Sequence, residues 1–69
     1  MFEVQHEDDA WELGVLTAVG FFDSPNGSQS AKELGVPANL VEFFHAGRHD
    51  HHALSQERIN VLAIQWGVS

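Results

Sequence analysis

The chain has 69 residues, a formal net charge of −7 at pH 7 from ten acidic and three basic side chains, and no cysteine. This length accommodates one domain, and the absence of cysteine excludes disulfides and thiolate zinc sites. The composition, 43% hydrophobic with five Phe and two Trp, excludes a disordered acidic tail and is typical of a globular chain.

The beginning of the chain differs from a secretion signal. The first ten residues, MFEVQHEDDA, are acidic where a signal peptide would be basic. The longest nearly apolar run, residues 13–22, has about half the length that a membrane-spanning helix needs. We therefore expect a soluble cytoplasmic protein that forms one domain over residues 1–69.

The first predicted helix lies near residues 9–21, and Asp8 or Asp9 is expected to cap it. Residues 2–6 precede it and alternate apolar with polar side chains, which suits either a short strand or a lead-in. Residues 15–22 could also form a strand, because glycine weakens a helix. The helical interpretation is favoured by one apolar stripe, formed by Trp11, Val15, Ala18 and Phe22.

The sequence DSPNGS, residues 23–28, combines proline with Asn-Gly and is predicted to be the linker. The second helix is expected near 29–34, with Ser30 and Glu33 at the spacing of a capping box and Gly35 as its stop.

A third helix is predicted near 38–46, beginning after Pro37 and ending at Gly47, a second glycine stop. Residues 48–52 would then be a polar connector. The last helix is expected near 55–66, capped by Ser55 and stopped by Gly67. Its buried stripe consists of Ile59, Leu62, Ala63 and Trp66.

These elements predict an all-α fold, a small three- to four-helix domain with an optional short N-terminal strand. Three segments share the pattern x-A-x-x-[LW]-G-V, ending at Val15, Val36 and Val68, and the same glycine stop on three helices explains it. A second apolar face on the last helix, with Val61, Ile64 and the following Val68, predicts a homodimer.

The central pair of helices resembles the bacterial and phage helix-turn-helix family over residues 27–46. Ala31 stands where that motif has a small residue at the helix crossing, and Gly35 stands at its turn. Val41 and Phe44 follow at the spacing of the motif's closing core residues. The resemblance implies a helical pair whose second helix could enter the major groove of DNA.

The side chains expected to face a groove fit DNA poorly. Only Asn39 suits a base contact, and Lys32 and Arg48 are the nearby cations. The full set of groove-facing positions is Pro37, Ala38, Asn39, Glu42, Phe43 and Ala46. A dimeric helix-turn-helix transcriptional regulator that uses Lys32, Asn39 and Arg48 therefore remains the alternative interpretation. Leu40 and Phe43 would serve either as core or as anchors for a protein partner.

The acidic side chains gather in the first third of the chain. Residues 1–23 contain six acids, Glu3, Glu7, Asp8, Asp9, Glu12 and Asp23, and no Lys or Arg. Such a surface repels a phosphate backbone and attracts a basic protein surface. In size and charge alone, the chain resembles the small acidic anti-CRISPR and anti-restriction inhibitors of phages.

We therefore expect an acidic interaction module that inhibits or regulates a nucleic-acid-binding protein and does not itself bind duplex DNA. Its expected partner-binding residues are Glu3, Glu7, Asp8, Asp9, Glu12, Leu40 and Phe43.

A histidine-rich segment, HAGRHDHH at residues 45–52, raises the question of a metal. His45 and His49 have a metal-binding spacing if one helix carries both, but the expected stop at Gly47 weakens that hypothesis. His52 is a third candidate, and a solvated polar loop is the favoured interpretation. We expect no cofactor and no metal. The sequence lacks G-x-S-x-G, H-E-x-x-H and phosphate-binding glycine loops, so we expect no enzyme.

Overall fold

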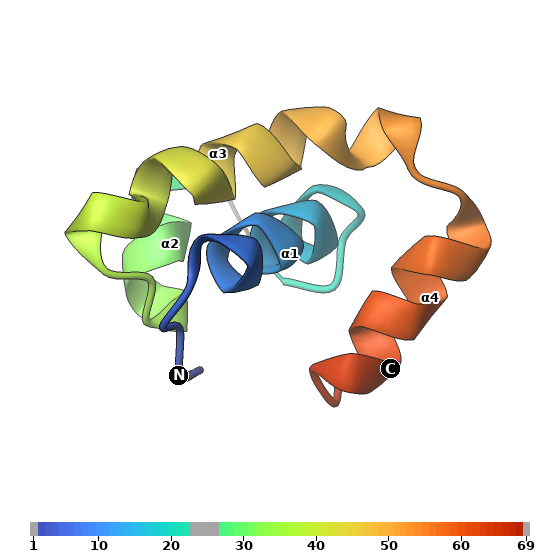
Figure 1. Ribbon diagram of the computed structural model, residues 1–69, viewed down its shortest axis with the longest axis horizontal. Helices are drawn as coiled ribbons and strands as arrows, with labels where there is room; N and C mark the ends of the chain where they lie inside the picture. The colour runs from blue at the N-terminus through green and yellow to red at the C-terminus, as the bar shows by residue number, and fades with distance from the viewer. Residues whose placement is uncertain (1, 23–26, 69) are drawn as a thin grey trace.

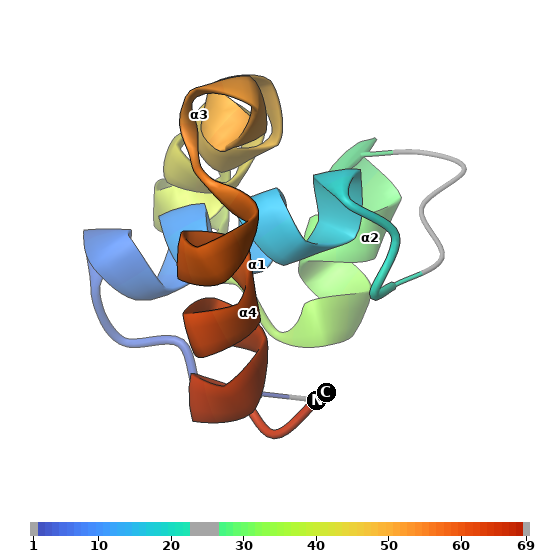
Figure 2. The same cartoon turned by 90° about the vertical axis from the view of Figure 1, so that its right-hand side faces the viewer.

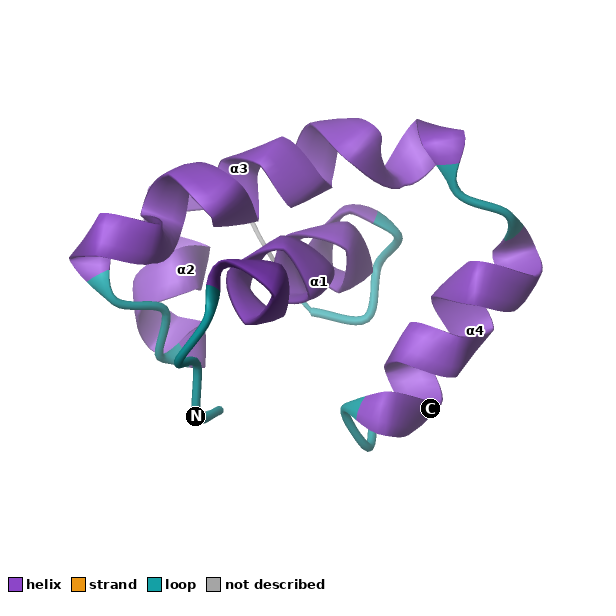
Figure 3. Cartoon of the chain, in the orientation of Figure 1, coloured by secondary structure: helices purple, strands orange, loops and turns teal. Residues whose placement is uncertain are grey.

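The computed structural model describes residues 2–22 and 27–68, with side chains in the second range from residue 31 onward. Its elements are four α-helices and two short 3₁₀ turns, shown in Figure 1 and coloured by type in Figure 3. The helices are α1 (Glu7–Ala18), α2 (Gly27–Leu34), α3 (Val41–Asp50) and α4 (Gln56–Gln65), and the turns are Ala38–Leu40 and His51–Ala53. The all-α prediction is confirmed.

The described residues contain no strand, so the two strand alternatives are wrong. The segment before α1 is instead an extended lead-in, held to the end of α2 by a hydrogen bond from the Phe2 amide to the Leu34 carbonyl at 2.9 Å. Residues 15–18 belong to α1. The predicted linker at 23–28 lies largely outside the described residues, since α2 begins at Gly27.

Helix α1 is the centre of the molecule. In Figure 1 α2 and α4 lie on opposite sides of it, and in Figure 2, which looks along α3, α1 runs across the view below that helix. Because neighbours cover α1 from several directions, Leu13, Val15 and Leu16 are all fully buried. Of the predicted stripe only Val15 is buried, because Trp11, Ala18 and Phe22 are half-buried. The stripe also omitted Ala10, Leu13 and Thr17, which are buried.

The same hydrogen-bond pattern ends three of the helices. After α2, the Gly35 amide donates to the Lys32 carbonyl and the Val36 amide to the Ala31 carbonyl, at 3.1 and 2.9 Å. Gly35 has a φ of +93°, which a side chain disfavours. The pattern recurs at Gly20 after α1 and at Gly67 after α4, so the predicted stops at Gly35 and Gly67 are confirmed.

The N-cap residue was predicted correctly for α4 but not for α1 or α2. His6, not Asp8 or Asp9, is the N-cap of α1, and the Asp9 carboxylate accepts the His6 amide at 3.2 Å. The prediction placed the cap too late because Asp9 acts from the third helical position. Ser55 caps α4 as predicted, accepting the Arg58 amide at 3.2 Å. Ser30 lies within α2, so it is not that helix's cap.

Two glycines let α1 and α3 come close together. A Cβ on Gly14 would overlap the Phe44 carbonyl oxygen, and one on Gly47 would overlap the Trp11 carbonyl oxygen. Gly47 is therefore buried inside α3, which continues to Asp50. The predicted stop at Gly47 was wrong, and the shared-stop explanation also fails at Gly14, because both glycines serve close packing.

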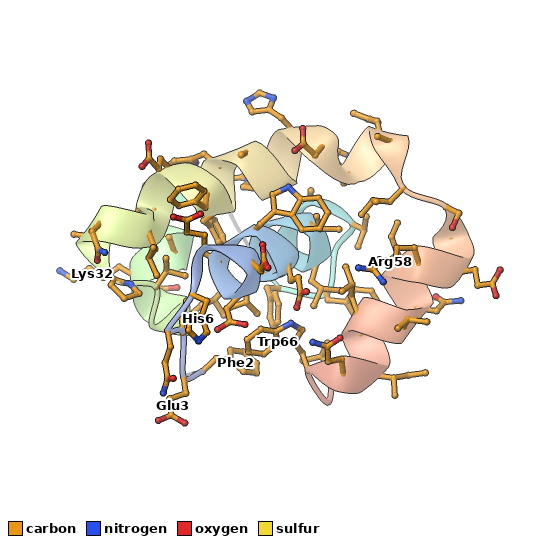
Figure 4. All side chains as sticks on the ribbon, viewed as in Figure 1. Phe2, Glu3, His6, Lys32, Arg58 and Trp66 are labelled. Carbon is orange, nitrogen blue, oxygen red and sulfur yellow. The ribbon has the colours of Figure 1, made fainter. Side chains whose placement is uncertain are left out.

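The core has two parts that meet at aromatic rings. Phe22 and Trp66 pack against both parts, and Phe2 contacts each of these rings edge-on, with centroids 5.6 and 5.5 Å away. Figure 4 shows Phe2 beside Trp66. The first part comprises Val4, Ala10, Leu13, Ala31, Val36, Leu40 and Phe44, and the second Val15, Leu16, Ile59, Leu62 and Ala63. The predicted stripe of α4 is thus confirmed.

Candidate partner-binding surface

Three carboxylates at the start of the chain are exposed, and we call them the acidic surface: Glu3, Glu7 and Asp8. Glu7 and Asp8 lie in the first turn of α1, where the unpaired amides of the helix favour negative charge. Glu3 lies in the extended lead-in, and its carboxylate accepts the Gln5 side-chain amide at 3.4 Å. A protein partner can therefore reach all three side chains.

The other two predicted acidic contacts have structural roles. Asp9 accepts the backbone amides of Gln5 and His6 and so closes the start of α1. Glu12 accepts the Trp66 indole N–H at 3.0 Å and the Gln65 side-chain amide at 3.3 Å. Glu12 thereby joins α1 to the end of α4, and both carboxylates are half-buried.

The two apolar anchors considered from the sequence lie in or against the core. Leu40 is 8% exposed and belongs to the first core part, while Phe43 is half-buried and packs against that part. Leu40 therefore offers a partner little area. Phe43 keeps part of its ring accessible.

The residues considered for DNA contact do not share one environment. Lys32 and Asn39 are exposed, whereas Arg48 is half-buried in α3. Lys32, at the end of α2, and Arg58, on α4, stand at opposite ends of the molecule in Figure 4. Of the positions expected to face a groove, Pro37, Ala38, Asn39 and Glu42 are exposed.

The histidines lie on α3 and on the turn that follows it. His45 and His49 are on one uninterrupted helix, half-buried and exposed respectively. His51 and His52 lie in the next turn with ring centroids 3.8 Å apart, and His51 Nδ1 is 2.7 Å from the Arg48 carbonyl oxygen. Within the described ranges, no three His, Asp or Glu side chains are arranged to hold one metal ion.

A contact between α1 and α3 was also missed from the sequence. The Trp11 indole N–H donates to the Asp50 carboxylate at 2.9 Å, linking α1 to the end of α3. A buried indole N–H usually finds an acceptor, so each tryptophan indicated that some polar group of the chain would accept from it. Sequence spacing could not identify which one, since the partners are 39 residues apart.

The part of the chain that the structure describes contains no pocket, and none of its helices is long and apolar enough to cross a bilayer. Comparison of the chain with protein-family models, curated proteins and solved structures gives no match.

Proposed function

We propose that this protein is a non-catalytic interaction module that binds a basic surface of a nucleic-acid-binding protein through Glu3, Glu7 and Asp8 and thereby inhibits or regulates it. The observation that carries the proposal is the exposure of these three carboxylates, two in the first turn of α1 and one in the segment that leads into it. Asp9 and Glu12, which have intramolecular partners, are assigned to stability instead of contact.

The distribution of positive charge supports a protein partner over duplex DNA. Binding to DNA gains most of its affinity from several cations that neutralise phosphates together. The chain has three Lys and Arg side chains, and Arg48 is half-buried, which leaves only Lys32 and Arg58 exposed for such neutralisation. The net charge of −7 adds repulsion from the phosphate backbone.

The same electrostatics sets the expected kinetics. Exposed charges steer association, and salt screens them over roughly 8 Å at physiological ionic strength. The association rate with the partner should therefore fall as salt rises, while the dissociation rate changes less. A surface held by apolar anchors alone would not show this dependence.

The experiment compares variants that differ only at exposed carboxylates. The wild type and the double variant Glu7→Gln, Asp8→Asn are each immobilised. Each is then incubated with nucleic-acid-binding proteins that heparin retains. The double variant Glu42→Gln, Glu57→Gln is the matched control, because it also removes two carboxylates that are exposed in the first turn of a helix. Each bound protein is identified, purified and measured again alone.

The proposal requires a purified partner that binds the wild type and the control, loses association rate with the double variant, and is displaced by duplex DNA. A shift assay with random duplex at low salt should show no complex with the chain alone. Sequence-specific duplex binding that Asn39→Ala abolishes would overturn the proposal in favour of a helix-turn-helix regulator.

A further inference from the structure

Helix α3 places two histidines on one face without a break between them. His45 and His49 are four residues apart within Val41–Asp50, and such a pair has Cβ atoms roughly 5–6 Å apart on a helix. The glycine between them, Gly47, remains helical because it packs against Trp11. The objection raised by the sequence, that Gly47 ends the helix, therefore does not hold.

The orientation of Gly47 also sets the side of α3 from which His45 and His49 project. Its Cα faces α1, and residues two positions before and after it are turned about 160° away at 3.6 residues per turn. His45 and His49 thus both lie on the side of α3 opposite α1. His49 is exposed and His45 is half-buried, so an ion from solvent can reach this side.

We propose that His45 and His49 together bind one divalent late transition-metal ion, of the class Cu²⁺, Ni²⁺ or Zn²⁺. Imidazole nitrogen suits these ions, and bonds of about 2.1 Å to each ring can be made from adjacent turns of a helix. No third protein ligand is arranged around the pair in the described residues, so water or a partner's side chain completes the coordination. The general order of affinities places Cu²⁺ first.

The neighbouring histidines are arranged differently. His51 and His52 follow α3 in a 3₁₀ turn, and the Nδ1 atom of His51 lies against the Arg48 carbonyl. His52 lies in this 3₁₀ turn, three residues after His49, and no group of three ligands forms there in the described residues. The double variant His51→Gln, His52→Gln is therefore the matched control, with two histidines removed outside the proposed site.

A bound ion would connect successive turns of α3 on both sides of Gly47. Because it binds the folded helix in preference to the unfolded chain, it stabilises the fold by mass action. The consequence is specific to this geometry: at a fixed metal concentration, metal should raise the melting temperature of the wild type and of the control more than that of His49→Gln.

The test is a calorimetric titration of the untagged chain with NiCl₂ and, separately, ZnCl₂, for the wild type, His45→Gln, His49→Gln and the control. We expect one ion per chain, an affinity loss of at least about tenfold for either single variant, and little loss for the control. Ring resonances of His45 and His49 should shift first on Zn²⁺ addition. If His45→Gln does not fold, the proposal is tested by His49→Gln alone, because His49 is exposed and its replacement leaves the core intact. Absence of saturable binding, or a loss confined to the control, would overturn the proposal.

Discussion

The α-carbon of Gly14 lies directly against the main-chain carbonyl of Phe44, so that a Cβ there would also come within 2.9 Å of the carbonyl carbon. Gly47 has the same relationship with the Trp11 carbonyl. Trp11 and Gly14 are three positions apart on α1, and Phe44 and Gly47 are three positions apart on α3. The two helices therefore exchange glycine-to-carbonyl contacts, in which the glycine hydrogen that replaces Cβ points at an oxygen.

This close approach of α1 and α3 predicts that alanine in place of Gly14 or Gly47 makes the fold less stable. In an ordinary helix interior, Gly→Ala stabilises by about 1 kcal/mol. Here the added methyl meets backbone, which cannot move aside as a side chain can, and forced overpacking costs about 1–3 kcal/mol. We expect Gly14→Ala and Gly47→Ala each to lower the free energy of unfolding, measured by urea denaturation with circular dichroism.

Gly20→Ala serves as the control for the crossing variants. Its Cβ would meet nothing within 4 Å, although its φ of +100° adds backbone strain. Replacement by Asn at Gly20 separates the two effects, because Asn tolerates that backbone conformation better. An increase in stability on Gly14→Ala would show that α1 and α3 do not approach closely in solution.

The turn that follows α2 predicts that the stability of the fold depends on glycine at position 35. Gly35 has a φ of +93°, and a β-branched residue is strained there. We expect Gly35→Val to destabilise the fold by more than about 1 kcal/mol and Gly35→Asn to cost less. Thermal melts of the two variants test this expectation. Equal melting temperatures for the wild type and Gly35→Val would contradict the left-handed turn.

Gly35 and Gly47 also show how far glycine can be interpreted from sequence. Both follow an apolar-periodic segment, so both were predicted to end a helix, and only Gly35 does. The difference is that α1 packs directly against the backbone of Gly47. A local sequence pattern does not indicate which helix will pack against a given residue. Local rules therefore gave the existence of four helices and the stops at Gly35 and Gly67, but not the crossing of α1 and α3.

The outer face of α4 predicts self-association. Val61 and Ile64 are 48% and 68% exposed and lie three residues apart on one side of the helix. Val68, which the sequence grouped with them, packs against the second core part and is half-buried. We expect a homodimer formed through Val61 and Ile64, with Ile64→Asp shifting the chain to monomer.

Sedimentation equilibrium over a range of chain concentrations measures this shift. Ala53→Asp is the control, because it adds the same charge at an exposed position outside α4. The melting temperature of dilute Ile64→Asp should lie only slightly below that of the dilute wild type, since the side chain lies outside the core and the new carboxylate opposes the dipole of the last turn of α4. A monomeric mass for the wild type at the highest chain concentration measured would contradict the homodimer prediction.

Glu12 and Trp66 illustrate why the acidic residues could not be separated from sequence alone. All five carboxylates between residues 3 and 12 have the same charge and a similar position in the chain. Only the fold brings the indole of Trp66, 54 residues away, to Glu12. The sequence therefore locates the acidic residues along the chain, while the division between exposed and engaged carboxylates required the packing of α4 on α1.

That division gives the last prediction. Exposed carboxylates and carboxylates that accept hydrogen bonds within the fold should differ in their contribution to stability. We expect Asp9→Ala to cost about 0.5–2 kcal/mol, because it removes the acceptor for the His6 amide. Glu12→Ala should cost about 1–3 kcal/mol, because it leaves the half-buried Trp66 indole without its acceptor.

Glu7→Gln and Asp8→Asn should each cost about 0.3–1 kcal/mol, the loss expected from a helix first turn, and Glu57→Gln should cost the same. Urea denaturation of the variants measures these differences, and Glu12→Gln, which keeps an oxygen acceptor, should lie between Glu12→Ala and the wild type. The partner's association rate should show the opposite order: large effects at Glu7 and Asp8, and small effects at Glu12 once the folded fraction is accounted for. If Glu12→Gln reduced association as strongly as Glu7→Gln without loss of stability, the contact would extend along α1, and the assignment of Glu12 to the junction with α4 would be wrong.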